Sequence, residues 1–125
     1  MKRRHGLALL SCLVLLAGCG ESEDAAQKGA AMLRAYYSQK PLDFGWEVTR
    51  IDRIADGELR IDVLVDDENV VNQIKIRSRM DQMSIARLAC PDPEHPFLKS
   101  LNHDLKMNIA LNTRDVVIVR SACRH

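Results

Sequence analysis

Cysteine and histidine side chains in the second half of the chain have the types that suit metal or redox chemistry. Cys90, His95, Cys123 and His125 could supply thiolate and imidazole ligands, which zinc prefers. Cys123-Arg124-His125 lacks the paired short spacings typical of a zinc site, and there is no Cys-x-x-Cys motif of a redox enzyme. In an oxidising compartment, two such cysteines most often form one disulfide. A metal site and a free or redox-active thiol are the alternatives.

Two loop histidines are the best candidates for acid–base catalysis, because imidazole titrates near neutral pH. His95 lies in a proline-rich segment and His103 stands between Asn102 and Asp104, so both are interpreted as solvated loop residues. The chain has no Gly-x-Ser-x-Gly elbow, no His-Glu-x-x-His and no phosphate-binding glycine loop. The acidic run 66–69 lacks the alternating oxygens and central glycine of a calcium loop, so it is interpreted as a helix cap. The sequence therefore predicts no enzyme, no cofactor and no metal.

Two groups of side chains are candidates for an interaction surface. The basic group would face anionic headgroups, lipopolysaccharide or an acidic partner, or it is an ordinary solvated helix face; it comprises Lys75, Arg77, Arg79 and Arg87. The aromatic group suits either an interface hot spot or the core, and the sequence leaves both open; it comprises Tyr36, Tyr37 and Trp46.

The N-terminus has the layout of a signal peptide. Three basic residues at positions 2–4 precede a mainly apolar run from Leu7 to Leu16, which is shorter than the roughly 20 residues needed to span a bilayer. The sequence Leu16-Ala17-Gly18-Cys19 that follows resembles the lipobox of bacterial lipoproteins. The resemblance implies that residues 1–18 are removed and that Cys19 becomes an N-terminal cysteine acylated with palmitate-like chains.

This resemblance gives the protein an expected location. Two or three acyl chains would hold it permanently on a membrane of the bacterial cell envelope, facing the periplasm. Gly20 after the cysteine slightly favours the outer membrane over the inner one. The lipidated cysteine and a short tether would occupy residues 19–23. Because the periplasm is oxidising, we predict a Cys90–Cys123 disulfide.

Size and charge limit what the remaining chain can be. Removing 18 of the 125 residues leaves enough for one small domain, expected over residues 24–125. The removed segment carries three of the eighteen basic side chains and none of the seventeen acidic ones, so the mature charge is nearly balanced. Aromatic residues make up only 4% of the chain. A nucleic-acid binder would show a basic surface or stacking aromatics, so this class is not expected.

The chain is expected to begin with a helix followed by a hairpin. Asp24 is a candidate N-cap, a helical stripe follows with buried positions 26, 30, 33 and 37, and the helix should stop before Lys40-Pro41. Strands 46–54 and 58–65 flank the turn Ala55-Asp56-Gly57. A change of phase in the first strand predicts a β-bulge near Thr49.

The rest of the chain predicts a helical segment and a second hairpin. Strands 105–112 and 116–121 are separated by a polar turn, and the apolar run 116–119 suggests a central strand. A helix is expected over 79–89, while residues 70–78 suit either its extension or a strand. Plotted as a helix, this segment shows two apolar stripes, one with Ile76 and Met80 and one with Val71 and Ile74.

Together these elements predict a small α+β domain. It has an N-terminal helix, then hairpin, helix and hairpin, an antiparallel sheet with helices mainly on one face, and one disulfide. The expected function is that of a non-catalytic, protein-binding adaptor or assembly factor at a membrane, with another envelope protein as its partner. The alternatives are a membrane-tethered binder or inhibitor of a periplasmic enzyme or ligand, and an enzyme with an unrecognised site.

Overall fold

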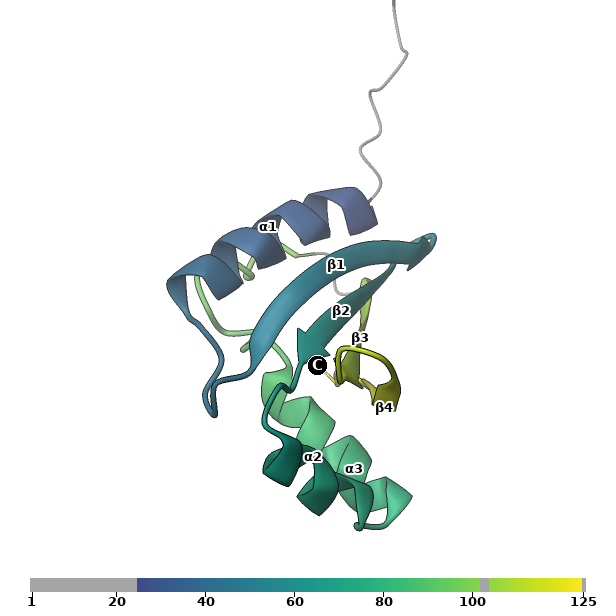
Figure 1. Cartoon of the computed structure of the whole chain (residues 1–125). Coiled ribbons are helices and arrows are strands. Elements are labelled where there is room, and N and C mark those ends of the chain that lie inside the picture. Colours follow the sequence, from purple (N-terminus) through teal and green to yellow (C-terminus); the bar gives the residue numbers. More distant parts are fainter. Residues whose placement is uncertain (1–24, 102–103, 125) are drawn as a thin grey trace, which may run out of the picture.

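Helices and strands follow one another in the predicted order. The computed structural model describes residues 25–101 and 104–124. The elements are α1 (Ala25–Gln39), β1 (Glu47–Ala55), β2 (Glu58–Leu64), α2 (Glu68–Lys75), α3 (Arg79–Ala86), the 3-10 turn η1 (Arg87–Ala89), β3 (Lys106–Asn112) and β4 (Val117–Ala122) (Figure 1). The small α+β domain is thereby confirmed. The predicted cleavage site, Cys19, the tether and the Asp24 cap lie outside the described residues.

The sheet is mixed, and its strand order is β1-β2-β3-β4. Both hairpins are antiparallel, but β2 and β3 run parallel, with Leu59 opposite Met107 and Ile61 opposite Ile109. The prediction of an entirely antiparallel sheet was therefore wrong at the central pair. The helical segment and loop between the hairpins return the chain to the end of the sheet where β2 began, and only such a crossover allows parallel pairing. Alternation in a sequence shows which face is buried but carries no information on strand direction.

Turns and irregularities inside the hairpins agree closely with the sequence. Gly57 has a φ of +67°, a conformation that suits glycine in the tight turn between β1 and β2. The register of β1 shifts between Val48 and Arg50, which confirms the bulge at Thr49. The prediction that the last strand is central was wrong, because β4 forms an edge of the sheet and Val116 and Val117 are exposed.

One hydrophobic core fills the space between the helices and one face of the sheet. The fully buried large side chains alternate along β2 and β3 and meet Leu33 of α1; they are Leu33, Leu59, Ile61, Val63, Val65, Leu105, Ile109 and Leu111. The four predicted stripe positions of α1 are all buried. A Cβ at Gly29 would lie 2.6 Å from Leu105 Cδ2, so this glycine lets α1 approach the core closely.

The ambiguous segment after β2 forms two short helices rather than one helix or a strand. Asp67 caps α2, since its Oδ1 accepts hydrogen bonds from the N–H groups of Asn69 (2.9 Å) and Val70 (3.3 Å). The helix ends after Lys75, and Ser78 caps α3 by accepting from the Asp81 N–H at 3.2 Å. The second cap changes the helical phase, so one apolar stripe cannot continue through residues 76–78.

Candidate interaction surfaces

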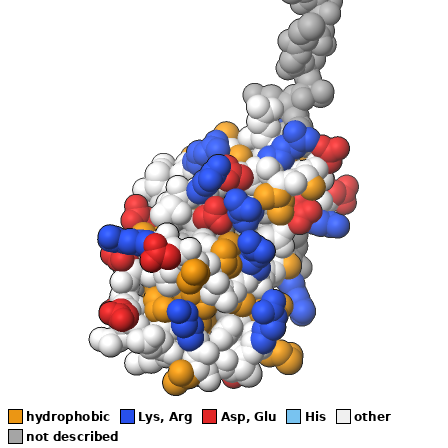
Figure 2. Space-filling view, turned by 45° about the vertical axis from the view of Figure 1, so that its right-hand side comes forward, with side chains coloured by type: hydrophobic (Ala, Val, Ile, Leu, Met, Phe, Trp, Pro, Cys, Tyr) orange, Lys and Arg blue, Asp and Glu red, His pale blue; other side chains and the backbone are white. Residues whose placement is uncertain are grey.

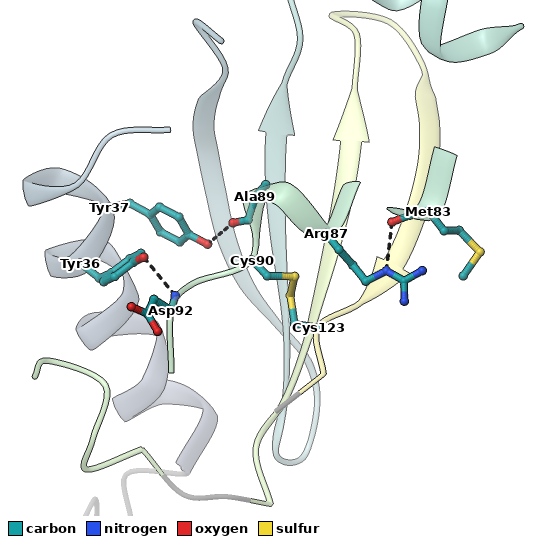
Figure 3. Close-up of a disulfide and its surroundings, with 8 residues drawn as sticks. All are labelled: Tyr36, Tyr37, Met83, Arg87, Ala89, Cys90, Asp92 and Cys123. Carbon is teal, nitrogen blue, oxygen red and sulfur yellow. Dashed lines mark hydrogen bonds between the residues drawn. A yellow bond between two sulfur atoms is a disulfide. The ribbon is translucent and has the colours of Figure 1, made fainter. Parts of the chain in front are cut away.

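A disulfide and two tyrosines tie α1, the loop after η1 and the last strand together (Figure 3). Cys90 and Cys123 are bonded with a Cα–Cα distance of 5.8 Å, which confirms the predicted disulfide. The Tyr37 hydroxyl donates to the Ala89 carbonyl at 2.6 Å, and the Asp92 N–H donates to the Tyr36 hydroxyl at 3.1 Å. Both sulfurs are used in the disulfide, so a metal site built on these two thiolates is excluded.

The tyrosine contacts are buried, and this changes the chemistry of the phenol. Burial raises the pKa of the Tyr37 hydroxyl well above its ordinary value, and the neighbouring Tyr36 raises it further. The phenol therefore stays protonated and acts as a hydrogen-bond donor throughout the neutral and moderately alkaline range. Its role is structural: it fixes the end of η1 against α1.

All three aromatic residues proposed for the core or for an interface belong to the core. Tyr36, Tyr37 and Trp46 are each at most 8% exposed. Tyr36 packs edge-on against Tyr37 with ring centroids 4.9 Å apart. The Trp46 Nε1 group is buried and has no hydrogen-bond acceptor among the described residues. Of the two alternatives, burial in the core holds for these side chains.

His95 packs edge-on against two aromatic rings and is not part of an acid–base pair among the described residues. Its ring lies 5.0 Å from both the Tyr36 and the Phe97 ring, and its Nδ1 accepts a hydrogen bond from the Phe97 N–H at 3.2 Å. His103 and His125 lie outside the described residues. Among residues 25–101 and 104–124, no three His, Cys, Asp or Glu side chains are grouped so that they could hold a metal ion.

The face of the sheet away from the core carries a ladder of paired charges. Arg60 Nε lies 3.1 Å from Asp62 Oδ1, and Arg50 Nε lies 2.5 Å from Asp52 Oδ2. Asn108 donates to Glu58 at 2.8 Å across the parallel pair. Positive side chains on this face thus stand beside negative ones, so the face does not form the continuous basic surface that binds nucleic acid.

The end of the domain formed by α2, α3 and their connection has a different surface. Ile76 and Met80 are 84% and 78% exposed, and the exposed cations Lys75, Arg77 and Arg79 alternate with them in the sequence. We call these five residues the tip. Ile76 and Met80 are four residues apart, which keeps their Cα atoms within about 14 Å. Figure 2 shows basic and hydrophobic side chains close together at the lower end of the domain.

The side chain of Gln82, which no sequence pattern singles out, holds the tip in shape. The Gln82 side-chain amide donates to the carbonyls of Ile74, Lys75 and Arg77 at 3.2–3.3 Å. The three carbonyls lie at the end of α2 and just beyond it, where helical hydrogen bonding stops, and among the described residues only that of Ile74 also accepts a backbone bond, from the Arg77 N–H at 3.1 Å. A side chain of α3 thus caps the end of α2. Spacing along the chain could not reveal this contact, because a glutamine eight residues after Ile74 meets it only when the helix breaks.

The fourth predicted basic residue is separated from the other three. Arg87 follows α3, and its Nε donates to the Met83 carbonyl at 3.3 Å, so its side chain lies back along the helix. An eight-residue helix is about 12 Å long, and that length separates Arg87 from Arg79. The predicted basic patch is therefore three cations at the tip together with one half-buried arginine elsewhere.

A cavity of about 360 Å³ lies beside edge strand β1. One wall is the last two turns of α1, another is the loop at Pro41 and Leu42, and the third is the continuous run 46–51 that includes the first half of β1. Arg34 Nη2 crosses from α1 to β1 and donates to the Ile51 carbonyl at 3.1 Å. Neither this cavity nor Gln82 was anticipated, because both depend on contacts between elements.

Comparison of the chain with protein-family models, with curated proteins and with solved structures finds no match. Among the described residues, no helix has both the length and the apolar character needed to cross a bilayer.

Proposed function

We propose that this protein is a lipid-anchored adaptor of the bacterial cell envelope that binds another envelope protein through the tip. The anchor in this proposal is Cys19, and it is supported by the resemblance of residues 16–19 to a lipobox. The single observation that carries the binding role is the tip itself, where two large apolar side chains are exposed among three cations. Burying such side chains in a partner is favourable by roughly 1.5–3 kcal/mol each.

The position of the tip favours a protein partner over the anchoring bilayer. Helix α1 lies at the upper end of the domain, and α2 and α3 form its lower end (Figure 1). A tether of four residues reaches only about 14 Å, so the end with α1 would sit close to the anchoring membrane. The tip would then point away from that membrane. Its cations suit an acidic rim around an apolar pocket on a partner, a common arrangement at interfaces.

The anchor is tested by acylation of the protein in cells. We expect an alkynyl palmitate analogue to label the wild-type chain, and Cys19→Ser to lose the label and remain as the longer precursor. A Cys12→Ser variant is the matched control and should be labelled and processed as the wild type. Normal processing of Cys19→Ser would contradict the anchor.

Photocrosslinking in intact cells tests the partner. A photoreactive amino acid at position 80 should give one dominant crosslinked species that mass spectrometry identifies as an envelope protein. The same group at position 88 is the control, because Leu88 is also exposed (62%) but lies beyond the far end of α3. Crosslinks of equal strength at both positions, or none at position 80, would contradict docking through the tip.

A further inference from the structure

The edge strand β1 borders a cavity and has one free side. Strand order places β1 at the margin of the sheet, where it pairs only with β2 among the described strands. An edge strand presents N–H and C=O groups to any extended chain that lies beside it. In a regular antiparallel strand both backbone groups of one residue point to the same side. Since the Ile51 carbonyl meets Arg34 outside the sheet, the Ile51 N–H also faces outward.

The exposed edge of β1 is not open to pairing with every extended chain. The bulge at Thr49 interrupts the regular ladder, and Arg34 occupies the Ile51 carbonyl. Both devices discourage pairing with arbitrary strands. A segment would bind here only if its side chains also made favourable contacts, and the cavity can bury an apolar side chain. The apolar part of the cavity wall consists of Tyr37, Leu42, Trp46 and Val48.

The charged residues around the cavity indicate which residues should flank an apolar side chain that enters it. The charged lining residues are Arg34, Arg50 and Glu47, but Arg50 is already paired with Asp52. Arg34 is therefore the cation that can meet an incoming acidic group. Arginine has five N–H donors, and the bond to Ile51 uses one of those on Arg34. A carboxylate on the incoming segment can therefore form a charge-assisted bond with Arg34. The Trp46 side chain also lines the cavity, and its Nε1 atom is buried with no acceptor among the described residues.

The cavity and the exposed edge of β1 together form a groove between α1 and β1. We propose that this groove binds an extended segment of a partner protein as an added strand, with an apolar side chain in the cavity and an acidic residue beside Arg34. Backbone pairing supplies affinity in this mode and the side-chain pocket supplies specificity. The groove is remote from the tip in sequence, and its occupancy requires neither the anchor nor the tip contact. Failure of one proposal therefore leaves the other intact.

Trp46 provides a direct readout, because it is the only tryptophan of the chain and it lines the groove. The probe is a set of capped heptapeptides in which a central Leu, Val or Phe is flanked by Glu or by Lys, added to the purified full chain. We expect saturable changes in tryptophan emission with the Glu-flanked peptides and at least tenfold weaker binding of the Lys-flanked ones.

Two matched controls separate strand addition from other modes. Peptides N-methylated at alternate residues keep their side chains but lose backbone donors, so they should bind at least tenfold more weakly. Ser38→Phe narrows the cavity from the exposed surface of α1 and should weaken binding similarly, whereas Lys28→Phe, on α1 but outside the cavity lining, should not.

Three results would overturn the proposal. The first is that no peptide changes the Trp46 emission. The second is that N-methylated peptides bind as well as their parents, which would assign the cavity to a side chain or small amphiphile alone. The third is a concentration-dependent dimer in sedimentation that Ser38→Phe abolishes, which would assign the groove to a second copy of this chain.

Discussion

The region around the Cys90–Cys123 disulfide and the tip differ in the burial of their large side chains. Around the disulfide, Tyr36 and Tyr37 are buried, and their hydroxyls bond to the backbone 56 and 52 residues away, respectively. At the tip, Ile76 and Met80 are exposed, and the bonds that hold the segment come from Gln82 nearby in the chain. The first region thus stabilises the whole domain, while the second is fixed locally and leaves apolar surface uncovered.

This difference has a consequence for mutational effects. Long-range contacts restrict the unfolded chain or fill the core, so their removal lowers the free energy of unfolding. Exposed side chains held on a locally capped segment contribute little to that free energy. Stability and binding are therefore expected to respond to different residues, and four measurements test this in order of decreasing effect on stability.

Removing the disulfide should have the largest effect. The two cysteines are 33 residues apart, and closing a loop of that size stabilises a fold by roughly 4 kcal/mol in the chain-entropy model. We expect Cys90→Ala with Cys123→Ala to lower the free energy of unfolding by about this amount in urea titrations. The reduced wild-type protein is the control and should behave like the double variant. A loss below about 1 kcal/mol would contradict the assigned role.

Removing the Tyr37 hydroxyl should have a smaller effect that depends on pH. At neutral pH, Tyr37→Phe loses one hydrogen bond and should cost about 0.5–1.5 kcal/mol. Above pH ~10 the unfolded chain releases the phenol proton while the folded chain keeps it, because burial raises the pKa of Tyr37 in the fold. Stability should then fall as the pH rises, by up to about 1.4 kcal/mol per pH unit for this group.

The phenylalanine variant lacks this proton and should lose less stability over the same alkaline range. The two unfolding curves, measured by urea titration from pH 7 to 11 with the disulfide intact, should therefore converge as the pH rises. Parallel curves would mean that the Tyr37 hydroxyl ionises equally easily in the folded and unfolded chain.

Removing the Gln82 amide should affect the tip alone. Gln82→Ala takes away the one side-chain amide that contacts three largely exposed carbonyls, so we expect a global cost of about 0.5–1.5 kcal/mol or less. Amide hydrogen exchange should rise in the last turn of α2 and remain unchanged in β2 and β3. The matched control is Gln73→Ala, because Gln73 is an exposed glutamine on α2 itself. Equal exchange in both variants would show that Gln82 does not hold the tip.

Changing the exposed apolar pair should leave stability nearly intact while removing binding. Ile76→Ser with Met80→Ser should change the free energy of unfolding by less than about 0.5 kcal/mol per site, as for other exposed positions. The same variant should lose at least tenfold in recovery of the partner identified by crosslinking. Leu88→Ser should change neither quantity. Retained binding in the double variant would move the docking surface away from the tip.

Several parts of the fold followed from local patterns. The end of α1 before Lys40-Pro41 was predictable because the residue before proline avoids the helical region. The Gly57 turn and the bulge at Thr49 were predictable because turn chemistry and side-chain phase are properties of neighbouring residues. The disulfide followed from having two cysteines in a domain expected to be exported.

Other parts were not predictable from the same patterns. The phase of Ile76 and Met80 looked like a second apolar stripe on a helix, but the Ser78 cap breaks that helix and exposes both. Val116 and Val117 suggested a central strand, yet β4 ends at the edge of the sheet. In both places the sequence shows that the side chains are apolar. Whether they are covered depends on distant parts of the chain, and in this fold no other element covers them among the described residues.

The sequence by itself determined the α+β class, the two hairpins, the buried stripe of α1 and the cysteine pair, because periodicity and turn residues act within a few positions. Only the tertiary structure decided that β2 and β3 run parallel, that Gln82 caps α2 and that a cavity lies beside β1. Each of these depends on contacts between residues distant along the chain or across a break in the helix. Such contacts form when the whole core packs at once, and no local pattern records them.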